Sequence, residues 1–110
     1  EQDVVSGDFP TVVSPNPEEP AALAMAVEKA KETNAELVLA SDPDADRVGA
    51  AVKNEAGEWI LVNGNQTALL FVYYLITRWK ELGRLHGNEY IVKTIVTTET
   101  IRTVAERNDV

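Results

Sequence analysis

Apolar residues recur at helical spacing in three stretches of the chain. In the first stretch they lie three or four residues apart: Leu23, Ala26, Val27 and Ala30. This spacing predicts an amphipathic helix that begins near Pro17 and ends near Asn34. The second stretch, 66–82, is apolar nearly all round, which predicts a deeply packed helix. Gly83 follows it and is the expected residue at the end of the helix. The third, 99–107, predicts a short amphipathic helix.

Four shorter runs have the composition of β-strands. The run 36–41 is almost wholly apolar, which is typical of a strand buried on both faces of a sheet. The runs 48–53 and 58–62 flank the turn residues 54–57, and this arrangement predicts a hairpin. The run 90–98 is rich in β-branched residues and predicts a further strand.

The order of these elements predicts the α/β class. We expect a three-layer α/β/α-like arrangement with a small mixed, mainly parallel sheet. The first twenty residues are predicted to be mostly irregular, because their prolines block regular pairing.

Composition narrows the class of protein further. The chain has 110 residues, of which 45% are hydrophobic and 25% charged, as in a soluble globular domain. The net charge of −8 argues against a nucleic acid or a membrane surface as a partner. The longest apolar run, 68–76, is far shorter than the ~20 residues that cross a bilayer. The chain has no cysteine, which excludes disulfides and fits a reducing compartment, and we expect a cytoplasmic protein.

The segment Ser41–Arg47, "SDPDADR", is the strongest candidate for chemistry. Asp42, Asp44 and Asp46 alternate along it, and Arg47 follows at once. Carboxylates this close repel one another unless a cation lies among them or water screens them. Their oxygens suit Mg²⁺, and the guanidinium of Arg47 offers paired donors to a phosphate. The position after a buried strand favours a ligand site over a solvated acidic turn, which is the alternative.

Two other motifs match this segment less well. An EF-hand loop that began at Asp42 would need glycine and glutamate where the chain has Arg47 and Lys53. A phosphatase with an aspartate nucleophile carries its Asp-x-Asp motif directly after a strand, whereas Asp44 is three residues further on.

Three segments in this order resemble the α-D-phosphohexomutase superfamily, and most closely its long phosphoglucomutase and phosphomannomutase type. They are "FPTVVSPNPEEPAAL" (9–23), "DPDADR" (42–47) and "GEWILVNGNQTALL" (57–70). The resemblance implies an intramolecular phosphotransferase, an isomerase that interconverts hexose 1-phosphate and hexose 6-phosphate through a phosphoserine enzyme and a bisphosphate intermediate. It also implies Mg²⁺ bound by Asp42, Asp44 and Asp46, with Arg47 as a catalytic residue beside the transferring phosphate.

The phosphoserine motif and the sugar-binding loop of that superfamily do not occur in this sequence. The resemblance therefore implies a central fragment, with 1–57 as the later part of domain II and 58–110 as the early part of domain III. We expect the fragment to be inactive alone and, because it would leave a sheet edge unpaired, to self-associate. In the full enzyme its partners would be the hexose phosphate and the other domains of the same chain. Two alternatives stay open: a non-catalytic module that binds a divalent metal, and a phosphatase with an aspartate nucleophile.

Overall fold

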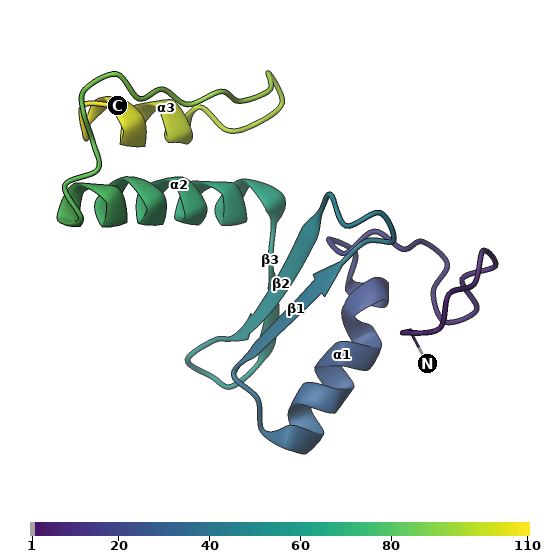
Figure 1. Ribbon diagram of the computed structural model, residues 1–110. Helices are drawn as coiled ribbons and strands as arrows, with labels where there is room; N and C mark the ends of the chain where they lie inside the picture. The colour runs from purple at the N-terminus through teal and green to yellow at the C-terminus, as the bar shows by residue number, and fades with distance from the viewer. Residues whose placement is uncertain (1) are drawn as a thin grey trace. The chain divides into compact units, whose positions relative to one another are not determined.

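The computed structural model describes residues 2–110, which form two compact units (Figure 1). The first unit ends at Gly64 and contains every strand of the described residues. The second unit, Asn65–Val110, is built from helices and irregular segments. The α/β class is confirmed.

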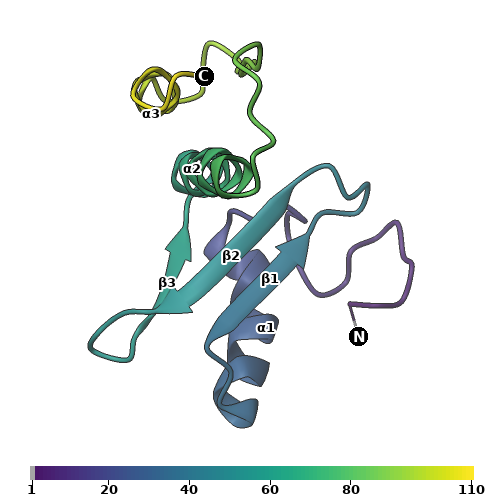
Figure 2. The ribbon, with the colours of Figure 1, turned by 60° about the vertical axis from the view of Figure 1, so that its left-hand side comes forward.

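The first unit is a three-stranded sheet with one helix against it. The strands are β1 (Leu37–Ser41), β2 (Val48–Lys53) and β3 (Trp59–Val62), in that spatial order. Helix α1 (Pro20–Thr33) lies along one face of this sheet, as Figures 1 and 2 show. Apolar residues of α1 meet apolar residues of the strands there, and this layer holds the core of the unit.

The sheet is antiparallel, so the prediction of a mainly parallel sheet is wrong. Both neighbouring pairs, β1 with β2 and β2 with β3, run in opposite directions. The reason is the length of the connections, since only residues 42–47 and 54–58 separate the strands. Antiparallel strands can be joined by such short loops, whereas parallel strands need a crossover of a dozen or more residues. The hairpin predicted around 54–57 is confirmed, with Gly57 at a φ of 80°.

Helix α1 begins three residues later than Pro17. Glu19 is extended (φ −89°, ψ 133°), because the residue before a proline is disfavoured in the helical region. The preceding residues form a turn instead, in which the side chain of Asn16 accepts a hydrogen bond from the backbone N–H of Glu18 (3.1 Å). At the other end Asn34 adopts the left-handed conformation (φ 53°) that closes many helices.

Within the described residues of the first unit, only one face of the sheet is covered. Val38 and Ala51 are buried against Leu23 and Ala30 of α1. Leu39 points to the opposite face and is 64% exposed. The prediction that this strand is buried on both faces is therefore wrong for this structure, because a helix packs against one face only.

A close backbone contact joins the turn before α1 to β2. A Cβ atom at Gly49 would lie 2.0 Å from the carbonyl oxygen of Pro17, which is closer than any real contact. Only glycine allows this approach, and Pro17 is buried as a result. The contact holds the start of α1 against the strand that follows the Asp-rich loop.

The second unit contains α2 from its second residue onward and α3. Helix α2 spans Gly64–Glu81 and α3 spans Thr100–Glu106, which confirms both predicted helices. The buried apolar residues of this unit are Ile76, Ile101 and Ala105. The prediction that α2 is packed on all sides is wrong, because several large side chains are more than half exposed: Leu70, Phe71, Tyr73, Tyr74 and Leu75. No helix in residues 2–110 is both long and apolar enough to cross a membrane.

The segment 90–98 does not form the predicted strand. Its backbone is irregular and turns at Thr94–Thr97, and four of its apolar residues are more than 80% exposed: Tyr90, Val92, Ile95 and Val96. A strand is stable only beside a neighbour that pairs with its N–H and C=O groups. No described strand pairs with this segment.

Candidate metal centre

The Asp-rich loop connects two paired strands. Ser41, the last residue of β1, lies opposite Val48, the first residue of β2. Both ends of the loop are therefore held at the spacing of neighbouring strands. Within the loop, the N–H of Ala45 donates to the carbonyl oxygen of Asp42 (3.1 Å), and Ala45 has a φ of 59°. This tight turn folds the loop back on itself.

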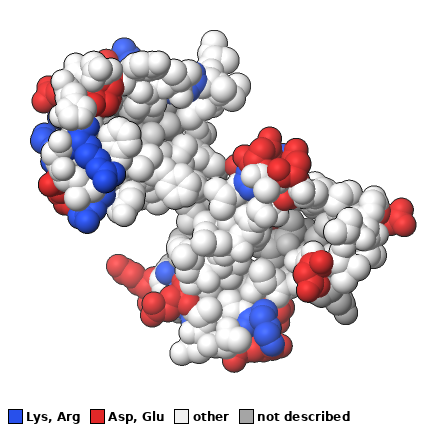
Figure 3. All heavy atoms as spheres, in the orientation of Figure 1, with Lys and Arg blue, Asp and Glu red and all other residues white. Residues whose placement is uncertain are grey.

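The turn brings the three predicted ligands together. One carboxylate oxygen from each of Asp42, Asp44 and Asp46 lies within 4.8 Å of the others. Asp42 is buried, whereas Asp44 and Asp46 are exposed. Figure 3 shows acidic atoms gathered over this end of the β1–β2 hairpin, with basic atoms beside them. The structure thus places all three carboxylates on one side of one short loop.

Arg47 contacts Asp42 through two different groups. Its backbone N–H donates to Oδ1 of Asp42 (3.1 Å), and its side-chain Nε–H donates to Oδ2 (2.7 Å). The Asp42 side chain has no exposed surface, whereas the Arg47 side chain is 57% exposed. Asp46 lies further from the same Nε, at 3.6 Å. The sequence predicts a phosphate as the partner of Arg47 and does not predict its hydrogen bonds to Asp42. The one signal in the sequence for these bonds is that the two residues lie five positions apart across a predicted loop.

These contacts move the pKa values of Asp42 and Asp46 in opposite directions. Burial raises the pKa of Asp42, but the backbone and side-chain hydrogen bonds from Arg47 outweigh it and hold the pKa at about 2. The pKa of Asp46 is raised, first by the hydrogen bond that its protonated form makes to Asp42 and then by the negative charges of Asp44 and Asp42. At neutral pH the loop therefore presents Asp42 as a firmly ionised carboxylate.

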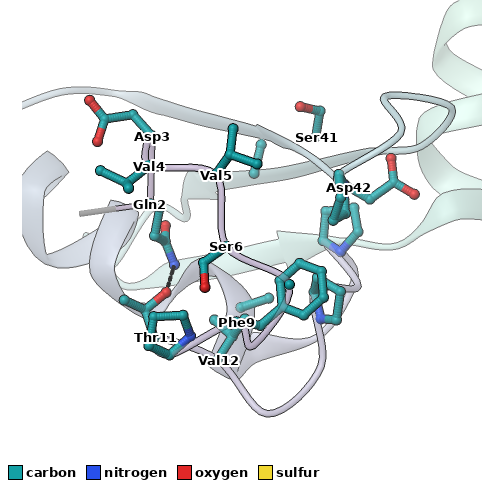
Figure 4. A pocket seen from close by; sticks show the side chains of 17 residues that line it. Gln2, Asp3, Val4, Val5, Ser6, Phe9, Thr11, Val12, Ser41 and Asp42 are labelled. Carbon is teal, nitrogen blue, oxygen red and sulfur yellow. Dashed lines mark hydrogen bonds between the residues drawn. The ribbon is translucent and has the colours of Figure 1, made fainter.

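A hollow of about 520 Å³ lies beside the loop, between the N-terminal segment and the end of β1. Its lining includes Val5, Phe9 and Ser41, and Asp42 stands at its edge. In Figure 4 the Asp42 carboxylate points away from Val5 and Phe9, toward the loop. The hollow thus borders the acidic cluster through Asp42.

The donor set fits a hard divalent cation. Three carboxylate oxygens from one loop match the preference of Mg²⁺ and Ca²⁺ for oxygen ligands, and the exposure of Asp44 and Asp46 leaves room for water or phosphate oxygens. The absence of cysteine from the sequence and the single histidine argue against a site for softer metals.

Comparison with known protein families finds a family model that matches this chain. The family model for phosphoglucomutase/phosphomannomutase, alpha/beta/alpha domain II, matches residues 1–57, which include the whole loop. The chain belongs to the phosphoglucomutase/phosphomannomutase family. The phosphohexomutase resemblance that the sequence motifs gave is thereby confirmed.

Individual members of the family agree with this placement. The chain is 38% identical to human phosphopentomutase over 102 residues, which are 89% of the chain and 17% of that protein. It is 46% identical to a probable phosphomannomutase of Haemophilus influenzae over 74 residues, 67% of the chain and 15% of that protein. It is 34% identical to Saccharomyces cerevisiae phosphoribomutase over 110 residues, 96% of the chain and 18% of that protein. These relatives are thus several times longer than the chain, and no solved structure matches it.

Proposed function

We propose that this chain is the metal-loop portion of a longer sugar-phosphate mutase. The relatives are named as mutases of pentose, ribose and mannose phosphates, which supports an isomerase that moves a phosphoryl group within a sugar phosphate. We propose a hexose phosphate as substrate, with a phosphoserine enzyme and a bisphosphate intermediate as the route. Residues 1–57 would belong to domain II and 58–110 to domain III of a cytoplasmic enzyme.

One observation carries this proposal: three carboxylates and one guanidinium converge on a single six-residue loop at the end of β1. Asp42, Asp44 and Asp46 would hold Mg²⁺, which when bound offsets negative charge on a phosphoryl group. The outer nitrogens of Arg47 would bind a phosphate oxygen, since a guanidinium presents its donors as a fork. Both the metal and Arg47 thereby suit the transfer of a dianionic group.

The exposed face of the sheet supports a longer enzyme. Leu37, Leu39, Val48 and Ile60 leave an apolar surface opposite α1. In a domain with helices on both faces of its sheet, a second helical layer covers such a surface. The family's own description, alpha/beta/alpha, names that arrangement.

The test is Asp44→Asn in the longer protein that carries this sequence. The substitution removes one charged ligand from an exposed position, so the protein should fold as before. Turnover of sugar 1-phosphate to the isomeric phosphate should fall at least about 100-fold, because even loss of a residue that hydrogen-bonds to a metal ligand costs about 10- to 100-fold. Steady-state kinetics with glucose, mannose and ribose 1-phosphates would also identify the sugar. Circular dichroism would verify the fold.

Asp8→Asn is the matched control, because Asp8 is an exposed aspartate outside the loop. It should retain wild-type turnover. Release of inorganic phosphate in place of the isomeric sugar phosphate would favour the phosphatase alternative. Binding of Mg²⁺ without any turnover in the longer protein would favour the non-catalytic module.

A further inference from the structure

We propose that Arg47 is a positioning residue for Asp42, besides its role toward a phosphate. Its Nε–H would hold the buried carboxylate in the orientation in which an Asp42 oxygen joins those of Asp44 and Asp46. The inference rests on the proposed metal-binding function of the loop and adds a second task for the same side chain.

Two hydrogen bonds from one residue fix the carboxylate of Asp42. The backbone N–H of Arg47 donates to Oδ1 (3.1 Å) and Nε donates to Oδ2 (2.7 Å). A single bond would leave the carboxylate free to rotate about its Cβ–Cγ axis, whereas bonds to both oxygens set the plane of the group. The backbone donor is itself anchored, because Val48 is the next residue and begins β2.

These two bonds leave Asp42 able to bind a cation. An ionised carboxylate has about four lone-pair sites, of which the two bonds use one on each oxygen. The oxygens of the three aspartates already lie within 4.8 Å of one another while Arg47 is bonded to Asp42. The bond to Arg47 is therefore compatible with the clustered arrangement of the carboxylates.

The side chain of Arg47 can divide its donors between two partners. The described contacts of its guanidinium with Asp42 and Asp46 are made by Nε, the nitrogen nearest the main chain. The side chain is 57% exposed, so the outer end of the fork reaches solvent. The inner nitrogen thus serves Asp42 while the outer nitrogens remain accessible to a phosphate.

A purely electrostatic role predicts the opposite effect on metal affinity. A positive guanidinium beside a cation site repels the cation, so removal of the charge should tighten metal binding. Positioning predicts weaker binding after the Nε–H donor is removed, because Asp42 then loses its fixed orientation. The sign of the change in affinity therefore separates the two roles.

Two variants of Arg47 separate the hydrogen-bond donor at the Nε position from the positive charge of the side chain. Arg47→Gln places an amide nitrogen the same number of bonds from Cα as Nε and removes the charge. Arg47→Lys keeps the charge but places a methylene at that position. We would titrate the full chain with Mn²⁺, a paramagnetic substitute for Mg²⁺, and measure free Mn²⁺ by electron paramagnetic resonance. Arg47→Lys should bind Mn²⁺ about 10- to 100-fold more weakly than wild type, as when other hydrogen-bond partners of metal ligands are removed. Arg47→Gln should lose clearly less affinity.

A metal-free measurement accompanies the titration. The Nε–H resonance of Arg47 should exchange with solvent more slowly than that of Arg78, whose ion pair with Glu81 uses a terminal nitrogen at a similarly exposed site. Exchange as fast as that of Arg78 would overturn the positioning role even where Mn²⁺ binds. So would wild-type affinity in Arg47→Lys, or a loss in Arg47→Gln as large as that in Arg47→Lys. Failure of the wild-type protein to bind Mn²⁺ would instead overturn the proposed metal function on which the inference rests.

Discussion

Residues 37–41 and 90–98 are both rich in apolar residues but have different structures. Both are rich in Val, Ile and Leu, as strands usually are. The first forms β1 and pairs along its full length with β2. The second stays irregular, and its backbone turns between Thr94 and Thr97. A β-rich composition therefore allows a segment to form a strand, but the strand forms only where a neighbouring strand is available to pair with it.

The two segments are also held by different forces. Val38 of β1 is buried in an apolar core beneath α1. The segment 90–98 is held mainly by polar contacts, in which Lys93 pairs with Glu99 at 2.6 Å and donates to the carbonyl oxygen of Thr97 at 3.0 Å. The predictions below test this difference in the 110-residue chain, from the largest expected effect to the smallest.

Gly49→Ala should disrupt the paired region most. The new Cβ would lie 2.0 Å from the carbonyl oxygen of Pro17, so that β2 or the turn before α1 must move. We expect a loss of about 3 kcal/mol in the free energy of unfolding of the first unit, at the upper end of the cost of overpacking. Urea unfolding followed by Trp59 fluorescence in a Trp79→Phe background would measure it. Gly7→Ala, where a Cβ meets nothing within 4 Å, is the control and should change little.

Val38→Ala and Val96→Ala make the same chemical change in the two segments. Val38 is 5% exposed and Val96 is 84% exposed. Loss of two buried methyl groups should cost about 2 kcal/mol at position 38, whereas position 96 should stay within about 0.5 kcal/mol of wild type. The same urea titrations, with circular dichroism for the second unit, give both values. Equal losses at the two positions would mean that segment 90–98 is packed in solution.

Lys93→Met should give the smallest effect, and one that depends on pH. The pKa of Glu99 is lowered, first by the hydrogen bond from Lys93 and then by its charge. A carboxyl with a lowered folded pKa adds stability above its unfolded value of 4.5 and loses it as the pH falls through the lower folded value. The variant should therefore unfold at slightly less urea than wild type at pH 7 and at the same concentration near pH 3. A difference that persists at pH 3 would assign the effect to the hydrogen bond from Lys93 to the carbonyl oxygen of Thr97, which does not depend on the ionisation of Glu99.

Local features of this molecule could be predicted from the sequence, and features that depend on distant residues could not. The Asp42–Arg47 loop and the turn at Gly57 are encoded within a few residues, and the structure has both the carboxylate cluster and the hairpin. The direction of the strands depends on which runs pair with each other. The identity of Leu39 as an apolar residue does not show whether a second layer covers its face of the sheet. Composition alone therefore gave the wrong strand direction and overstated the burial of β1.

The same distinction applies within the candidate metal centre. Alternation of Asp42, Asp44 and Asp46 was enough to predict that their carboxylates lie together. The bond from Nε of Arg47 to Asp42 depends on the turn at Ala45, whose positive φ is uncommon for a residue other than glycine. The residue types in the loop do not predict a positive φ at Ala45, so the bond from Arg47 to Asp42 could be found only in the structure.

The β1–β2 register also bears on how the Asp-rich loop can be inherited. All four charged groups lie in one continuous segment, and the pairs from Leu37 with Val52 to Ser41 with Val48 support it from both sides. A stretch of gene that encodes residues 37–53 therefore contains the loop and the strands that hold it. Recombination with breakpoints at 34–36 and 54–57 would transfer the candidate centre between related proteins as one inherited block. A breakpoint inside the hairpin would separate the candidate ligands from the register that aligns them.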